Sequence, residues 1–165
     1  MPIAYKLILL LTGFSTALIT GLFYSYSCSV NIGLGRLPDH EYLRSMQSIN
    51  RAILNPWFFA SFIGTLILLP ICTWLIYRNE AASVTFYLLL FAALVYLIGV
   101  FGVTIFGNVP LNEALDKFNI GSATLGELKL QRTEFENPWN RLNLVRTIGS
   151  LISLLLTLAG MVIRL

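Results

Sequence analysis

Amide side chains crowd three short polar stretches of the sequence, each of which adjoins a long apolar run. The flanking stretches are Gln47–Trp57 and Asn137–Arg141, and the central one is Gly107-Asn108-Val109-Pro110-Leu111-Asn112-Glu113. Polar groups at membrane depth are expensive and tend to mark function. Amides both donate and accept hydrogen bonds, so they suit a ligand with carbonyl or hydroxyl oxygen atoms. We therefore expect the three stretches to meet in one ligand site.

Helix capping explains some of these amides but not all of them. Asn55, Asn108 and Asn137 stand where predicted helices begin, and asparagine is a favoured N-cap residue. The amides that fall inside predicted helices lack this explanation: Gln47, Asn50, Asn112 and Asn140. The candidate ligand-binding residues are Gln47, Asn50, Arg51, Trp139, Asn140, Arg141 and Arg146, and the candidate catalytic residues are Asn108, Asn112 and Glu113.

Metal-binding patterns are missing from the sequence. It contains one histidine, His40, and two cysteines, Cys28 and Cys72, which lie in separate apolar runs. A zinc site needs about four nitrogen or sulfur ligands, haem between helices usually needs an axial histidine, and a carboxylate iron site needs Glu-x-x-His pairs. We therefore predict no metal, no cofactor and no structural disulfide.

The composition points to a lipid environment. Of the 165 residues, 56% are hydrophobic and only 12% are charged, whereas roughly a quarter of the residues in a soluble domain are charged. Four apolar runs, at about 7–30, 56–77, 84–106 and 142–163, approach or exceed the roughly 20 residues that a membrane-spanning helix needs. The net charge of +3 without a basic run gives no support to nucleic-acid binding.

The segments between these runs predict short helices at one side of the membrane. Asp39 can cap a helix that ends near Leu54, and Pro110 can open another that ends near Phe118. Thr124 and Glu127 have capping-box spacing, which predicts a helix over 125–135. Asn-Pro-Trp then precedes the fourth run, as it does the second. The expected fold is a single all-α domain over 1–165, an integral membrane four-helix bundle with short interfacial helices on one side.

The basic residues predict the orientation of this bundle. Four antiparallel spans place both termini and the turn at Arg78 on one side of the membrane. The other side then has eight basic residues against three: Arg36, Arg44, Arg51, Lys117, Lys129, Arg132, Arg141 and Arg146. Because positive charge favours the cytoplasmic side, the loops 31–55 and 107–141 are predicted to be cytoplasmic.

Several of these motifs together resemble the anthrone-oxygenase-like family of small four-span membrane proteins. They are Gln47-x-x-Asn50-Arg51, Asn55-Pro56-Trp57-Phe58, Gly107-Asn108-Val109-Pro110-Leu111-Asn112, and Trp139-Asn140 with Arg146. The similarity runs over nearly the whole chain, and Gly-Asn-Val-Pro-Leu-Asn is its most specific part. Fungal members with an assigned activity insert oxygen from O₂ into anthrones to give anthraquinones, without metal or flavin.

This resemblance implies an oxygenase that acts on a small aromatic or quinone-like compound. Such chemistry requires removal of a proton and stabilisation of the oxyanion that forms. Glu113 is the carboxylate nearest the central motif and is the candidate base, although it also suits the first turn of a helix as a favourable charge. The amides would bind substrate oxygen atoms, Trp139 would stack on the ring, and Arg141 or Arg146 would stabilise negative charge.

Two other classes of function stay open at this stage. One is a non-catalytic membrane module that binds a lipid, a quinone or a partner protein. The other is a transporter, for which four short spans would have to assemble into a homo-oligomer. The candidate aromatic side chains also suit simple packing against lipid or neighbouring helices.

Overall fold

The computed structural model describes residues 3–164, and within them the chain is helical without any strand. Its α-helices are α1 (Ile3–Ser25), α2 (Asn31–Leu34), α3 (Asp39–Ala52), α4 (Pro56–Glu80), α5 (Val84–Val95), α6 (Val109–Lys117) and α7 (Leu125–Val162). Three π-helical turns, Tyr26–Val30, Tyr96–Gly102 and Thr104–Asn108, and a 3₁₀ turn, Ile120–Ser122, complete the described elements. The π-helical turns make α1 continuous with α2, and α5 continuous with α6.

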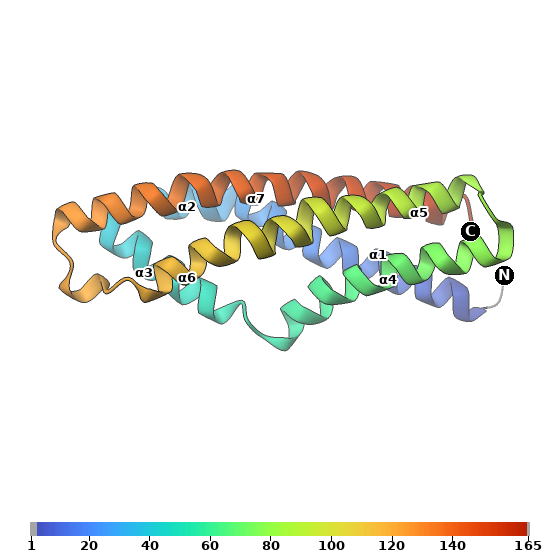
Figure 1. Ribbon diagram of the computed structural model, residues 1–165, viewed down its shortest axis with the longest axis horizontal. Coiled ribbons are helices and arrows are strands. Elements are labelled where there is room, and N and C mark those ends of the chain that lie inside the picture. The colour runs from blue at the N-terminus through green and yellow to red at the C-terminus, as the bar shows by residue number, and fades with distance from the viewer. Residues whose placement is uncertain (1–2, 165) are drawn as a thin grey trace.

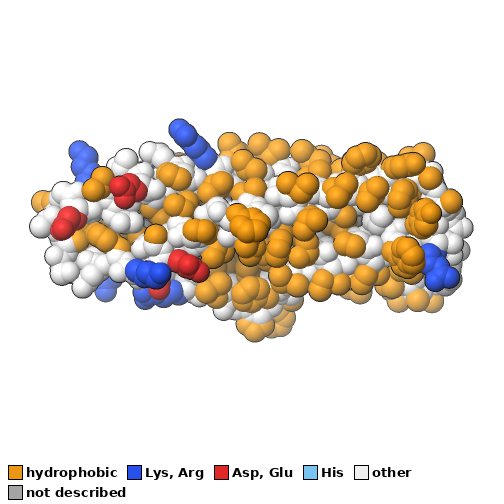
Figure 2. All heavy atoms as spheres, in the orientation of Figure 1, with side chains coloured by type: hydrophobic (Ala, Val, Ile, Leu, Met, Phe, Trp, Pro, Cys, Tyr) orange, Lys and Arg blue, Asp and Glu red, His pale blue; other side chains and the backbone are white. Residues whose placement is uncertain are grey.

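Four of the described helical stretches are long and apolar enough to cross a membrane: Ile3–Leu34, Pro56–Glu80, Val84–Lys117 and Leu125–Val162. They lie side by side, with both termini and the α4–α5 turn at one end (Figure 1). The opposite end, here called the polar end, carries α2, α3, α6 and the beginning of α7. Figure 2 shows acidic and basic side chains gathered there, whereas the rest of the visible surface is mostly apolar. The predicted all-α membrane fold is confirmed, and the protein is a multi-pass integral membrane protein.

Predicted caps are present at the starts of two helices, α4 and α7. The Asn55 side chain accepts hydrogen bonds from the backbone N–H groups of Trp57, at 3.0 Å, and Phe58, at 3.1 Å. Pro56 occupies the first turn of α4, where a missing N–H costs nothing. Thr124 and Glu127 form the predicted capping box at the start of α7. Because these local devices use only nearby residues, they could be read from the sequence.

The prediction that a new helix starts at Asn137-Pro138-Trp139, after a separate short helix over 125–135, is wrong. Helix α7 is a single helix of 38 residues that continues through Pro138. A proline within a helix removes one backbone hydrogen bond, but Pro138 faces outward, as does Glu134, whose carbonyl loses its partner. Leu128 and Trp139 lie buried on the inner side of the same helix, and their packing holds it together across the proline.

The helix of the third span likewise continues beyond Phe106, and Asn108 is not a cap. Asn108 is buried and helical, within the π-helical turn that joins α5 to α6. In this turn the N–H of Val109 bonds to the carbonyl of Thr104, five residues back, which leaves room for Pro110 to follow. A π-helical turn inside a helix frequently marks a functional site. The central motif therefore lies within a continuous helix.

The first connection also differs from the prediction. The first helical stretch continues to Leu34, so the break falls at 35–38 and not at Asn31. Asp39 is the first residue of α3 and makes no cap; its carboxylate instead accepts a hydrogen bond from Arg132 of α7, at 2.9 Å. Arg132 also donates to the carbonyl of Leu37, at 2.7 Å, which ties this connection to α7.

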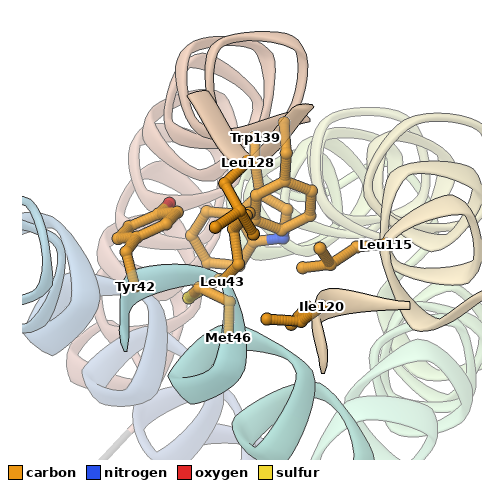
Figure 3. Close-up of a cluster of buried hydrophobic side chains, with 8 residues drawn as sticks. Tyr42, Leu43, Met46, Leu115, Ile120, Leu128 and Trp139 are labelled. Carbon is orange, nitrogen blue, oxygen red and sulfur yellow. The ribbon is translucent and has the colours of Figure 1, made fainter. Parts of the chain in front are cut away.

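Helix α3 packs across the polar end and closes it. Tyr42, Leu43 and Met46 of α3 point toward Leu115 and Trp139, and together they form most of a buried cluster (Figure 3). The Arg132 guanidinium lies 4.5 Å from the centre of the Tyr42 ring. Burial raises the pKa of the Tyr42 hydroxyl, so that side chain stays neutral beneath the guanidinium.

Two glycines, Gly107 and Gly149, bring the π-helical turns of the third span close to α7 near the central motif. A Cβ atom on Gly107 would come within 2.9 Å of Leu142 of α7, and one on Gly149 would come within 3.3 Å of the Gly99 carbonyl oxygen. Gly149 lies about one turn from Arg146. The close approach therefore sets Arg146 against the π-helical part of the third span.

The topology predicts that Asn79, near the α4–α5 turn, and Thr124, at the start of α7, lie on opposite sides of the membrane. We expect single cysteines at these positions, in a chain where Cys28 is replaced by serine, to react with an impermeant thiol reagent from opposite faces of sealed vesicles. Both positions reacting from the same face would contradict the fold.

Candidate functional site

Arg146 of α7 is the most unusual charged residue of the molecule. Its side chain lies inside the bundle, only 6% exposed, and it makes no ion pair within residues 3–164. One terminal nitrogen donates to the Asn143 Oδ1 atom at 3.0 Å, and the other lies 3.5 Å from the Thr104 hydroxyl oxygen. The Nε atom is buried without a partner. The fold thus holds a cation in place without neutralising it.

Aromatic rings stabilise this cation from two sides. The guanidinium carbon lies 4.6 Å from the centre of the Phe23 ring and 5.4 Å from that of Trp139. Such cation–π contacts are worth about 2 kcal/mol when the groups are desolvated. Tyr26 packs against Trp139, with ring centres 5.6 Å apart. The rings offset part of the cost of burying Arg146, yet they leave its positive charge available to an anionic oxygen.

A cavity of about 80 Å³, the inner cavity, lies beside this guanidinium. Its polar lining comes from two π-helical turns and from α3, α6 and α7, and consists of Tyr26, Asn50, Thr104, Asn112, Trp139, Asn143 and Arg146. Its apolar lining is Leu22, Phe23, Ile49, Ile53, Leu54, Phe58 and Val109. The Asn50 Nδ2 atom is buried without a hydrogen-bond partner. Unpaired donors on a buried arginine and an asparagine around one cavity are the arrangement that a ligand oxygen would complete.

A second cavity of about 230 Å³, the outer cavity, adjoins the first. Both are lined by Asn50, Leu54, Val109 and Asn112, and the outer one adds four charged residues: Arg51, Glu113, Asp116 and Lys117. Arg51 and Asp116 form an ion pair at 2.5 Å. The site therefore has an inner compartment with one buried cation and an outer compartment with charges of both signs.

Trp139 is fixed by one contact from the central motif. Its indole N–H donates to the Asn112 Oδ1 atom at 2.8 Å. Asn108 lies one turn earlier, donates weakly to the Trp139 carbonyl at 3.5 Å, and has a buried Oδ1 atom without a partner. Asn112 thus holds the indole ring, and Asn108 contacts the backbone of the same residue.

The structure distributes the predicted residues unevenly. Asn50, Asn112, Trp139 and Arg146 line the inner cavity, whereas Arg51 and Glu113 line only the outer one. The Gln47 side-chain Nε2 atom donates to the backbone carbonyls of Leu115, at 2.8 Å, and Phe118, at 2.9 Å, at the C-terminal end of α6. Asn140 and Arg141 line neither cavity.

Four residues that line the inner cavity stand outside the predicted candidate site: Phe23, Tyr26, Thr104 and Asn143. Asn143 could have been included, because it precedes Arg146 by three residues and therefore shares its face of a helix. Phe23, Tyr26 and Thr104 belong to spans without any local mark of function. Only the packing of α1 and the third span against α7 brings them to Arg146.

Comparison with protein families gives a match for anthrone oxygenase over residues 57–156. The chain belongs to the anthrone oxygenase family. The matched region of this anthrone oxygenase family member contains α4, α5, α6 and most of α7, and thus Asn112, Trp139 and Arg146. Comparison with curated proteins gave no match, and comparison with solved structures gave none either.

For this anthrone oxygenase family member we predict purification without a stoichiometric transition metal or haem. Among residues 3–164 no three His, Cys, Asp or Glu side chains are grouped so as to hold a metal ion. The prediction rests on this missing ligand set. Elemental analysis and an absorption spectrum of the purified protein test it, and a Soret band or a full equivalent of iron, copper or zinc would refute it.

Proposed function

We propose that this protein is a membrane-embedded oxygenase that needs no cofactor and acts on a small aromatic, anthrone-like substrate with O₂. The buried Arg146 guanidinium, which has no acidic partner within residues 3–164, is the observation that supports this proposal most. A buried cation is expensive to keep and tends to mark function. Stabilisation of an anionic oxygen of the substrate is a function that would explain why Arg146 is buried.

The reaction begins with the loss of a proton from the acidic carbon of the anthrone. The resulting enolate carries its negative charge largely on oxygen and is electron-rich enough to react with O₂. A carbon–oxygen bond forms at that carbon and gives a peroxide anion, which regains the proton to become a hydroperoxide. The hydroperoxide then loses water and becomes the quinone carbonyl. One oxygen atom of O₂ thus enters the anthraquinone and the other leaves as water, so that no external reductant is required.

The protein's contribution is to stabilise the enolate and position its ring. Arg146 would hold the oxyanion, as donors preorganised toward developing charge do in other enzymes. Trp139 would stack on the ring, and the unpaired Asn50 amide would bind a second oxygen atom. This arrangement favours the deprotonated substrate over the neutral one, which is the difference on which the rate depends.

The cavity sizes suggest how the substrate extends through the site. Ligand pockets are usually larger than about 300 Å³, and the inner cavity of about 80 Å³ is too small for a tricyclic compound by itself. The rings would therefore extend past Asn50 and Asn112 into the outer cavity of about 230 Å³. Glu113 lines that cavity and is the proposed base. It would accept the proton at the open side of the site, where water can carry it away.

Replacing Glu113 with glutamine tests this assignment. We expect the purified wild-type protein to convert an anthrone to its anthraquinone with incorporation of one ¹⁸O atom from ¹⁸O₂, measured by mass spectrometry. The variant should lose about 10²–10⁴-fold in rate, the usual contribution of a general base. Glu134→Gln, on the exposed side of α7, is the matched control. Wild-type turnover with an unchanged variant would remove Glu113 from the mechanism.

A non-catalytic module that binds a quinone or a lipid is the second candidate. It is favoured by one observation, that no carboxylate lines the inner cavity. Arg146 would then donate to a ligand carbonyl without any chemistry. Extraction of the purified protein and identification of its bound small molecules distinguishes the two, because a retained quinone or phospholipid without O₂-dependent turnover favours the module.

The orientation in the membrane is a further part of the proposal. The excess of basic residues at the polar end would place the loops 31–55 and 107–141 in the cytoplasm. The outer cavity would then open toward the cytoplasmic side, where a base can exchange its proton with water.

A further inference from the structure

A third hollow at the polar end shares Arg51 and Asp116 with the outer cavity but holds no group that the proposed reaction uses. It is a cleft of about 560 Å³ between α3 and the connection from α6 to α7, here called the α3 cleft. It is lined by His40, Arg44, Gln47, Ser48, Arg51, Asp116, Phe118, Asn119, Ile120 and Gly121. Unlike the inner cavity it is mainly polar, and four of its side chains lie along one side of α3: His40, Arg44, Ser48 and Arg51.

The charges that face the cleft are not balanced. Asp116 is its one carboxylate and is already paired with the Nε atom of Arg51, at 2.5 Å. The two terminal nitrogens of Arg51 donate no hydrogen bond within residues 3–164. Arg44 makes no ion pair with any described residue. The unpaired guanidinium of Arg44, the two terminal nitrogens of Arg51 and the Ser48 hydroxyl are therefore all available to bind one anion in the cleft.

We propose that the α3 cleft binds a phosphate group. Arginine donors are spread along α3 and not at one point, which suits an anion with several acceptor oxygens, and guanidinium groups pair with phosphate through two hydrogen bonds. Asp116 accepts the Nε–H of Arg51 and holds that guanidinium in place, while the two terminal nitrogens of Arg51 stay available to the anion.

The position of the cleft favours a lipid headgroup as the source of the phosphate. Three residues after α3 the chain enters α4, whose second residue, Trp57, is 86% exposed. Exposed tryptophans concentrate at the headgroup level of a membrane. Basic pockets at that level bind anionic headgroups. A phosphatidic acid carries the required phosphate monoester, and a soluble phosphate ester is the other source.

Native mass spectrometry of the detergent-solubilised protein tests the proposal with three probes: short-chain phosphatidic acid, phosphatidylcholine of the same chains, and inorganic phosphate. We expect a one-to-one adduct with phosphatidic acid at concentrations where phosphatidylcholine gives none. Arg44→Gln should weaken this adduct about tenfold or more, because it removes a charge-assisted hydrogen bond. Arg44→Lys, which keeps the charge, should restore part of the affinity.

The control is Arg36→Gln, which removes the same charge from the same end outside the cleft and should leave the adduct unchanged. Since Arg44 has no ion pair to lose, its variants are expected to fold. Displacement of the lipid by inorganic phosphate would support the cleft and identify soluble phosphate as sufficient, whereas retention of the lipid would identify the headgroup with its chains as the ligand. Equal affinity of wild type and Arg44→Gln, or equal binding of phosphatidylcholine, would overturn the proposal.

Discussion

Replacing Arg146 with methionine is expected to abolish oxidation of an anthrone-like substrate, with a loss of about 10²–10³-fold or more in rate. This is the usual cost of removing one preorganised donor to an oxyanion, and Arg146 adds a full charge to its hydrogen bonds. Methionine fills a similar volume without charge, so the packing against Phe23 and Trp139 is largely kept. Steady-state turnover and equilibrium binding of a non-oxidisable phenol or naphthol are the measurements.

Stability distinguishes this role from a structural one. A charged side chain within a membrane costs about 2.5–3.5 kcal/mol, and no acidic group within residues 3–164 repays that cost at Arg146. Arg146→Met should therefore unfold at the same temperature as the wild type or higher. Arg78→Met, at the exposed end of α4, is the matched control, and it should change neither the turnover rate nor the unfolding temperature. A variant that is less stable but binds normally would mean that Arg146 serves only the fold.

Replacing Asn112 with alanine is expected to produce the second largest loss, about 10²-fold in turnover. Its Oδ1 atom accepts the hydrogen bond from the Trp139 indole, and Asn112 also lines both cavities. The change leaves a buried N–H without a partner, at a cost of about 1–3 kcal/mol, and frees the ring to rotate. Asn79→Ala, at the opposite end of the molecule, is the control for loss of an exposed amide.

A double-mutant cycle with Trp139→Phe separates positioning from direct binding. Residues in contact give non-additive effects, and the cycle measures their coupling. If Asn112 acts only by holding the indole, the double variant should match Trp139→Phe. If its amide also donates to the substrate, the double variant should be slower than either single one. Turnover equal to wild type in Asn112→Ala and in Glu113→Gln would show that the proposed site is wrong.

Local patterns made most of the membrane fold predictable. Four apolar runs predicted four spans, and the caps at Asn55 and Thr124 lie where their hydrogen bonds require. The boundaries at Pro110 and Pro138 were not predictable in this way. At each proline the sequence predicted the start of a new helix, and in each case the helix is continuous instead: the backbone hydrogen bonds shift to a π-helical register before Pro110, and buried side chains pack on both sides of Pro138.

The candidate site likewise combines residues that the sequence could predict with residues that only tertiary packing brings together. The sequence drew attention to the amides and to two arginines, Arg141 and Arg146, without choosing between them. Five residues along a helix of 3.6 residues per turn amount to a rotation of about 140°, so the two side chains cannot enter the same cavity. The packing of α7 against its neighbours turned Arg146 inward, onto Phe23, and left Arg141 exposed.

By itself, therefore, the sequence predicted that this protein lies in a membrane, that it has four spans and a polar end, and that it resembles its family. Those properties follow from composition, from runs of apolar residues and from short-range hydrogen bonds. Only the tertiary structure decided which cation is buried, which rings surround it and which amides remain unpaired beside it. These depend on the rotation of each helix about its axis, and that rotation is set by contacts between residues such as Phe23 and Arg146, which are far apart in the chain.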